Sequence, residues 1–169
     1  IPARNAPLEE KTLNDIKANY QEIRDLCKGS DNGFPFIPVD RGAKDVGEED
    51  RERIYDKFWE LGGFRLLVES FNDLTIDEFA NETAANYIRQ KIREMVKDPK
   101  VAEMLCPYDH PYGTKRPPID TNYYDTYNRD NVSLIDVRKA PIVEITPQGV
   151  RTEDSEYELD VLVLSLIHI

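Results

Sequence analysis

The first half of the chain carries apolar residues at steps of three and four, which is the period of an amphipathic helix. One apolar stripe predicts a helix of about five turns that ends near Gly29, and it comprises Leu13, Ile16, Tyr20, Ile23 and Cys27. A second helix is predicted from about Glu48 to Leu61, where Gly62-Gly63 stops it. The Gly- and Pro-rich segment between the two, residues 31–47, is predicted to be an irregular loop.

A third predicted helix has the clearest pattern. Thr75 and Glu78 have the spacing of a capping box, in which a hydroxyl and a carboxylate pair with backbone N–H groups at a helix start. The helix is expected to end near Asp98, which would cap a short helix from Pro99, because proline suits the first helical position. The apolar face of the third helix comprises Ala80, Ala84, Tyr87, Ile88, Ile92 and Met95.

The second half of the chain changes to short apolar runs that are typical of strands. Strands are predicted at Val132–Val137, Ile142–Thr146 and Val150–Thr152, with a turn at residues 147–149. Residues Leu159–Leu164 contain the uninterrupted apolar sequence VLVL. Such a run is typical of a strand that is covered on both faces, as in a parallel sheet.

These patterns predict an α/β protein in which a helical module precedes the end of an α/β domain. A parallel strand that is buried on both faces needs neighbouring strands and covering helices. The residues after Cys106 are too few to supply them. We therefore expect the α/β fold to be incomplete within this chain, with the missing strands in a longer protein.

The net charge of −11 over 169 residues disfavours two classes of partner. Nucleic acids need a basic footprint, and anionic membrane surfaces attract basic segments, so neither is expected. No apolar run approaches the roughly 18 residues of a membrane helix. The two cysteines, Cys27 and Cys106, are too few for a disulfide framework, and they predict reduced thiols in a cytoplasmic protein.

Against this acidic background, the adjacent cations Lys115 and Arg116 stand in a loop that is punctuated by Gly113 and Pro117. Lysine can act on a phosphate as a point charge, and arginine as a planar fork of donors that stays protonated. The alternative is a solvated basic pair, which is a common surface feature. The chain contains neither a G-x-G-x-x-G motif nor a P-loop, so its own residues predict no nucleotide cradle.

Cys106 and His110 give a weaker signal, since they could form half of a metal site or a nucleophile with its base. A structural zinc needs four ligands and a catalytic zinc needs three, and the remaining histidine is His168. No metal is therefore expected. A small buried thiol and a loop histidine are the simpler interpretation.

The loop that carries the two cations resembles a known family. The sequence is similar to the cyclohexanone-monooxygenase-type Baeyer–Villiger flavin monooxygenases at Gly113–Pro117, Asp120–Tyr124 and Tyr127–Val132. Further similar segments extend the resemblance to residues 1–164, and they are Ile1–Asn5, Gly62–Arg65, Asn81–Met95 and Glu158–Leu164. The block around Lys115-Arg116 is the most specific of these matches.

The resemblance implies an enzyme that binds FAD and uses NADPH and dioxygen to convert a ketone into an ester or lactone through a peroxyflavin. It matches Arg116 with the family's catalytic arginine beside the flavin, where a permanent cation stabilises developing negative charge. It matches Lys115 with the contact to the 2′-phosphate of NADPH. Phe64 and Leu66 match a segment that borders the substrate pocket.

The resemblance also implies a division of the chain. Residues 1–112 match the helical insertion of the NADP-binding domain, and residues 113–164 match the C-terminal strands of that Rossmann-like domain. Residues 165–169 replace the family's Ala-Thr-Gly continuation and are expected to be an aberrant or truncated tail, with His168 non-functional. Because both glycine motifs of the family are missing, we expect the isolated chain to be inactive.

Two other classes of protein are compatible with the sequence. A related flavin-containing monooxygenase that oxidises nitrogen or sulfur atoms would share most of these features, because the signature that separates the two lies outside this sequence. A non-catalytic acidic helical interaction module would need no cofactor and would fold cooperatively from this chain alone.

Overall fold

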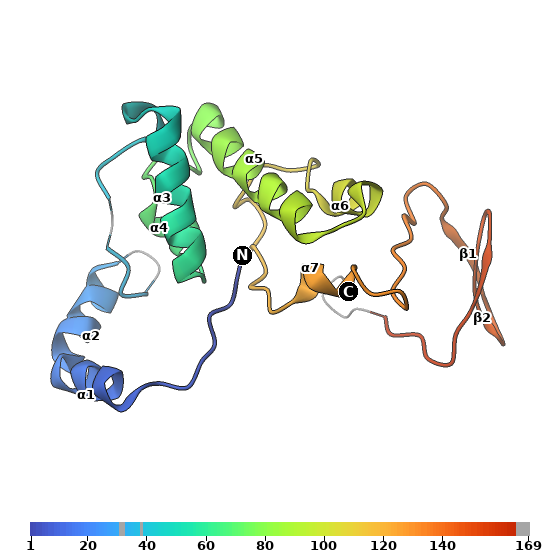
Figure 1. Cartoon of the computed structure of the whole chain (residues 1–169), viewed down its shortest axis with the longest axis horizontal. Coiled ribbons are helices and arrows are strands. Elements are labelled where there is room, and N and C mark those ends of the chain that lie inside the picture. The colour runs from blue at the N-terminus through green and yellow to red at the C-terminus, as the bar shows by residue number, and fades with distance from the viewer. Residues whose placement is uncertain (31–32, 38, 165–169) are drawn as a thin grey trace. The chain divides into compact units, whose positions relative to one another are not determined.

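A computed structural model describes residues 1–30, 33–37 and 39–164 of the chain. It divides into two compact units, Ile1–Arg129 and Asp130 onward, and each is described by itself (Figure 1). Within the described residues, no helix combines the length and the apolar character that a membrane span requires. The expected aberrant tail, residues 165–169 with His168, lies outside the described residues.

The first unit is helical. The predicted first helix is divided in two, and two short helices, Arg65–Glu69 and Tyr123–Thr126, form where none was predicted. The starts and ends predicted for the second helix and the start predicted at Pro99 are confirmed. The helices are α1 (Glu10–Ala18), α2 (Tyr20–Gly29), α3 (Glu48–Leu61), α4 (Arg65–Glu69), α5 (Glu78–Met95), α6 (Pro99–Leu105) and α7 (Tyr123–Thr126), with a 3₁₀ turn, η1 (Ala43–Asp45), before α3.

The prediction of a single first helix is wrong, because Asn19 separates two helices, α1 and α2. The side-chain amide of Asn19 donates to the carbonyl oxygen of Asp15 at 2.9 Å, and its backbone N–H donates to the same oxygen at 3.1 Å. Such local side-chain bonds of asparagine compete with the regular helical ladder. The apolar stripe of these two helices is not buried in the core, since neither α1 nor α2 has a buried residue.

The core of the first unit is built from α3, α4 and α5 and is rich in aromatic rings. Tyr55 of α3 meets Phe71 edge-on with ring centroids 5.4 Å apart, and it packs on Tyr87 of α5 at 5.2 Å. Ala80 and Ala84 are fully buried on the same face of α5, where small side chains leave room for the rings. A second cluster extends from the C-terminal end of α5 and comprises Ile92, Val96, Ala102 and Cys106.

The start of α5 differs from the predicted capping box. The N-cap residue is Asp77, not Thr75, and the Asp77 carboxylate accepts a hydrogen bond from the Ala80 N–H at 2.9 Å. The prediction is wrong because a charged acceptor lies two positions after the threonine, and carboxylates are favoured at helix N-termini. The predicted cap of α6 is confirmed, since Asp98 accepts from the Lys100 N–H at 2.7 Å.

The N-terminal segment joins two distant parts of the first unit. Gly63 donates its N–H to the Pro2 carbonyl at 3.0 Å, and Ala3 donates to the Asp120 carbonyl at 2.6 Å. Pro2 and Asp120 form an isolated parallel bridge. The turn before α4 and the loop before α7 are therefore held by one short segment.

The second unit contains an antiparallel sheet in the order β1-β2-β3, with β1 at Ile142–Thr146, β2 at Gly149–Thr152 and β3 at Glu156–Glu158. The strands predicted at Ile142–Thr146 and Val150–Thr152 are confirmed. The prediction of a strand at Val132–Val137 is wrong. Residues 132–136 have no regular secondary structure, and a turn begins at Val137. In that turn the Asp136 carboxylate accepts from the Arg138 N–H at 3.1 Å, a local bond that aspartate favours.

The strand predicted at Leu159–Leu164 is not formed in this structure. Val161 is 75% exposed and Val163 is 84% exposed. A strand needs hydrogen-bonded neighbours, and the sheet that the chain does form is antiparallel. The described chain is therefore helical with a small antiparallel sheet, and it does not itself contain the parallel sheet of the predicted α/β domain.

Replacement of Gly62 by alanine is expected to destabilise the first unit by about 2 kcal/mol or more, because side chains rarely adopt its conformation. Gly62 has φ +71°, and an added Cβ would lie 2.5 Å from the Pro2 carbonyl oxygen. Urea unfolding followed by circular dichroism measures the change. Gly29→Ala is the matched control, since nothing lies within 4 Å of its added Cβ and no loss is expected there. Equal stability of the two variants would contradict the prediction.

Acid is expected to weaken the contact between α3 and α5 through Asp56. The Tyr87 hydroxyl donates to Asp56 at 2.7 Å, and this bond, with help from Lys91, lowers the pKa of the carboxyl below its ordinary 3.8. A lowered pKa means that the stabilisation is present above about pH 4 and is lost as the pH falls through the folded-state value. Unfolding by urea at pH 6 and pH 3 measures this loss.

Tyr87→Phe should reduce the difference in stability between the two pH values. Tyr55→Phe is the control, because the Tyr55 hydroxyl bonds to Thr83 at 2.8 Å and not to a carboxylate. This control should lower stability equally at both pH values. A Tyr87→Phe variant with the wild-type acid response would refute the role of this bond.

Candidate functional site

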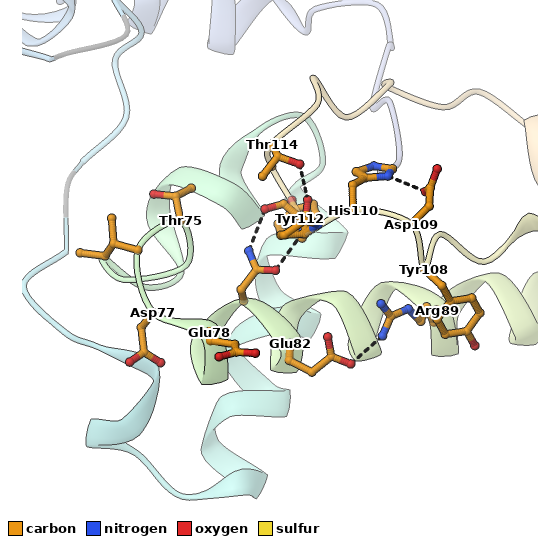
Figure 2. Close-up of a pocket in the computed structure, with 14 residues that line it drawn as sticks. Thr75, Asp77, Glu78, Glu82, Arg89, Tyr108, Asp109, His110, Tyr112 and Thr114 are labelled. Carbon is orange, nitrogen blue, oxygen red and sulfur yellow. Dashed lines mark hydrogen bonds and ion pairs between the residues drawn. The ribbon is translucent and has the colours of Figure 1, made fainter.

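The predicted functional loop connects α6 to α7 and carries Lys115 and Arg116. Its residues 108–114 and the N-terminal half of α5 border a pocket of about 690 Å³ (Figure 2). The lining includes the carboxylates of Asp77, Glu78, Glu82 and Asp109. An acidic lining repels phosphate groups, so this pocket does not suit a nucleotide.

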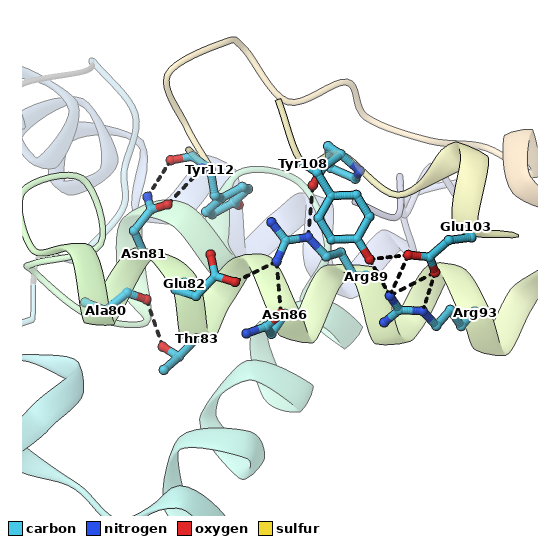
Figure 3. A network of polar contacts seen from close by, with 11 residues as sticks. Ala80, Asn81, Glu82, Thr83, Asn86, Arg89, Arg93, Glu103, Tyr108 and Tyr112 are labelled. Carbon is cyan, nitrogen blue, oxygen red and sulfur yellow. Dashed lines mark hydrogen bonds and ion pairs between the residues drawn. The ribbon is translucent and has the colours of Figure 1, made fainter. Parts of the chain in front are cut away.

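Asn81 on α5 fastens the loop at Tyr112 (Figure 3). The Asn81 amide donates to the Tyr112 carbonyl at 2.8 Å and accepts from the Tyr112 N–H at 2.9 Å. It also donates to the Leu74 carbonyl at 2.7 Å. A primary amide has both donors and an acceptor, so one side chain satisfies both backbone groups of Tyr112.

Arg89 fastens the same loop about two turns further along α5, where it is 6% exposed (Figure 3). Its Nε donates to the Pro107 carbonyl at 2.9 Å, and its guanidinium lies over the Tyr108 ring with Cζ 4.5 Å from the centroid. Its Nη1 also donates to Glu82 at 2.8 Å and to Asn86 at 2.9 Å. Because a buried cation is unfavourable without partners, these contacts specify one position for the loop.

An exposed group of side chains continues the network from Tyr108 (Figure 3). Arg93 donates to Glu103 at 3.0 Å and to the Tyr108 hydroxyl at 2.6 Å. The Tyr108 hydroxyl in turn donates to Glu103. This bond, together with Arg93, lowers the pKa of the Glu103 carboxyl.

Lys115 and Arg116 follow the fastened part of the loop, and both are exposed. The Lys115 Nζ lies 3.9 Å from the Asp109 Oδ2, with 67% of the lysine side chain exposed. Arg116 lies over Phe64, with Cζ 4.8 Å from the ring centroid. The structure thus brings together two of the predicted residues, Arg116 and Phe64, and places Lys115 beside Asp109.

The two predicted pocket residues differ in burial. Phe64 precedes α4 and is half-buried, whereas Leu66 within α4 is 0% exposed and belongs to the core. A side chain without exposed surface cannot contact a ligand unless its helix moves. The pocket-lining role of Leu66 therefore stays a prediction.

Cys106 and His110 contact different partners. The Cys106 thiol is buried against the Arg89 carbonyl, at 3.7 Å, and burial raises its pKa. His110 Nδ1 lies 2.6 Å from Asp109 Oδ1. Over residues 1–30, 33–37 and 39–164, no three His, Cys, Asp or Glu side chains are grouped closely enough to hold a metal ion.

Asn81 and Arg89 hold the loop in place, and neither was among the functional residues predicted from the sequence. Both lie on the helix whose apolar face was recognised, and Arg89 directly follows Ile88 of that face. Arginine is rarely buried without partners. An arginine that adjoins an apolar stripe is therefore the sequence feature that could have identified Arg89 as a buried, bonded residue.

No family model matches the sequence, whereas curated relatives match almost all of it. The 2-oxo-Δ3-4,5,5-trimethylcyclopentenylacetyl-CoA monooxygenase of Pseudomonas putida is 41% identical over 162 residues, which are 96% of this chain and 30% of that protein. Cyclohexanone 1,2-monooxygenase of Acinetobacter sp is 42% identical over 165 residues, with the same shares. A phenazine N-monooxygenase of Lysobacter antibioticus is 40% identical over 167 residues, 98% of this chain and 30% of its own.

Solved structures have the same fold over nearly the whole chain. OTEMO in complex with FAD and NADP has a TM-score of 0.91 and 41% identity, and the match covers 94% of this chain and 30% of that one. Oxidized steroid monooxygenase bound to NADP has a TM-score of 0.90 and 45% identity, over 95% of this chain and 30% of that one. The chain thus spans about 30% of the length of the relatives it matches.

Replacement of Arg89 by methionine is expected to lower the free energy of unfolding by about 2 kcal/mol, because charged hydrogen bonds to the loop are lost in a buried place. Arg93→Met is the matched control, since Arg93 also contacts Tyr108 but is exposed, and it should have a smaller effect. Chemical denaturation compares the two variants, and hydrogen exchange at Tyr108–Tyr112 reports release of the loop. Equal losses in both variants would show that burial of Arg89 does not hold the loop.

Proposed function

We propose that this chain, which is homologous over nearly its whole length to cyclohexanone-monooxygenase-type Baeyer–Villiger monooxygenases, is part of an FAD- and NADPH-dependent enzyme. The enzyme inserts one oxygen atom of dioxygen into a ketone and releases an ester or a lactone. One observation carries the proposal: an identity of 41–42% with named monooxygenases over 96% of the chain.

The flavin cradle is proposed to come from the part of a longer protein that corresponds to the rest of the relatives' length. This sequence has no G-x-G-x-x-G motif, and the match covers about 30% of each relative named above. The chain supplies a different component, which is a pair of cations on a fastened loop. The cofactors of the neighbouring structures, FAD and NADP, both carry phosphate groups that such cations suit.

Arg116 is proposed to act on negative charge that develops beside the flavin, which supplies the oxygen-transfer chemistry when it is bound. The donor set fits this role, because a guanidinium cannot deprotonate and Arg116 is exposed at the end of the fastened loop. A fixed cation in a site from which water is excluded stabilises such charge strongly. Phe64, which contacts Arg116, is proposed to border the ketone pocket.

Lys115 is proposed to contact the 2′-phosphate of NADPH. Its ammonium is a compact charge on a flexible chain, and its contact with Asp109 at 3.9 Å is weak enough to be exchanged for a phosphate. This contact would favour NADPH over NADH, which lacks that phosphate.

The second unit and the chain division are also proposed from the family. Residues 1–112 form the helical insertion and residues 113–164 the end of the Rossmann-like NADP-binding domain. The exposed run Val161–Leu164 supports the assignment of the later residues to an incomplete sheet, because it has the composition of a buried strand and is uncovered here. In the longer protein it would pair with strands that this chain does not contain.

A second candidate reaction is the oxidation of a nitrogen atom. The relative from Lysobacter antibioticus, at 40% identity over 98% of the chain, is named a phenazine N-monooxygenase. The two reactions share a flavin and NADPH and differ in the acceptor atom. Chromatographic product analysis separates them when cyclohexanone and phenazine are offered to the same enzyme.

The full-length protein that contains this chain is expected to be yellow and to convert cyclohexanone into its lactone with consumption of NADPH. Arg116→Ala should retain FAD but lose oxygenation by about 100-fold or more, as when a single donor to a developing anion is removed. Absorbance at the flavin band and gas chromatography of the product measure both properties. An Arg116→Ala enzyme with full oxygenation would overturn the assignment of Arg116.

Lys115→Ala should raise the KM for NADPH about tenfold or more while kcat stays similar, because a charged contact to a phosphate is lost. The KM for NADH is the internal control, and it should not change. A parallel rise in both KM values would mean that Lys115 does not read the 2′-phosphate.

A further inference from the structure

We propose that Phe64 is a positioning residue that holds the Arg116 guanidinium over its ring and so presents this cation to the reaction. This inference rests on the proposed function and adds to it a role that is separate from contact with a ketone. The two residues come from distant segments, the turn before α4 and the loop before α7. The Arg116 Cζ lies 4.8 Å from the Phe64 ring centroid, within the range of a cation–π contact.

The backbone of Phe64 is fixed on its N-terminal side. Gly62 and Gly63 both have positive φ, and Gly63 donates its N–H to the Pro2 carbonyl at 3.0 Å. The segment that contains Pro2 is bonded on its other edge to Asp120, four residues after Arg116. One short segment thus sets the separation of the two chain stretches that meet at the Arg116–Phe64 contact.

The ring of Phe64 is supported by other aromatic rings. Phe34 packs on it with centroids 6.5 Å apart, and Phe36 stacks on Phe34 at 5.3 Å. The Arg65 guanidinium lies over Phe36, with Cζ 5.2 Å from the centroid. Glu69 anchors this row, because it is buried, pairs with Arg65 at 2.5 Å and accepts from the Ile37 N–H at 3.0 Å.

A ring holds an arginine in a way that a carboxylate does not. The ring attracts the face of the guanidinium, whereas the five N–H donors lie in its plane and point outward. The contact therefore restricts the side chain without neutralising its charge or consuming its donors. Over the described ranges, Arg116 has no ion-pair partner, so its charge is available to an anion.

The neighbouring cation provides a contrast on the same loop. Lys115 lies beside the Asp109 carboxylate and not beside a ring, as suits a flexible point charge that exchanges partners. Arg116 instead contacts the Phe64 ring, which restrains the direction of the guanidinium. The two neighbouring cations thus differ in restraint: Lys115 has a long contact with a carboxylate, and Arg116 is oriented by a ring.

The experiment compares Phe64→Leu and Phe64→Tyr in the FAD-loaded full-length enzyme at saturating ketone and NADPH. Loss of the ring should lower kcat about tenfold, whereas Phe64→Tyr, which keeps the ring, should recover most of that loss. Phe79→Leu is the matched control, because Phe79 is a half-exposed phenylalanine that contacts the cations of Lys44 and Arg51. It should leave kcat unchanged.

A double-mutant cycle of Phe64 and Arg116 supplies a second readout. If Phe64 only lined the pocket, its replacement would change kcat by the same factor with and without the Arg116 substitution. Arg116→Ala removes the cation that the ring holds, and adding Phe64→Leu to it should change kcat by less than about twofold. Phe64→Met, which fills space without a ring, replaces Phe64→Leu if the latter does not retain FAD.

The inference is overturned if loss of the ring changes only the KM for the ketone, or if the effects of the two substitutions on kcat are additive. A wild-type enzyme that consumes no NADPH in the presence of ketone or phenazine would instead overturn the proposed function. The two failures are therefore distinguishable.

Discussion

The position of the candidate site depends on one buried cation, Arg89. An arginine that is 6% exposed must have its donors satisfied, and the loop after α6 supplies the Pro107 carbonyl for that purpose. Asn81 fixes the same loop again at Tyr112. These two attachments fix the loop as far as Tyr112, shortly before Lys115 and Arg116, and the N-terminal segment fixes the chain again at Asp120.

Much of the first unit could be predicted from local sequence signals. The apolar stripe of α3, the glycines that end it and the Asp98-Pro99 start of α6 each lie within a few residues of the element that they define. The failures arise where two local signals compete. Asn19 interrupts an apolar stripe that is otherwise continuous, and Asp77 takes the N-cap from Thr75.

The second unit and the site were harder to predict because their determinants are not local. The strand expected at Leu159–Leu164 needs partners from outside this chain, so its apolar residues are exposed here. Lys115 and Arg116 could be singled out by their charge and by the family resemblance. Arg89 and Asn81 could not, since their function is to bind backbone groups that are 18 and 31 residues away.

The parallel bridge between Pro2 and Asp120 sets the order in which the first unit can fold. Closing a chain segment of this length loses considerable entropy, whereas the contacts between α5 and α6 are close in sequence. The helical core is therefore expected to form before the N-terminal segment docks. On this expectation the Arg116–Phe64 pair assembles late, and a chain that lacks its longest-range contacts would have the core without the site.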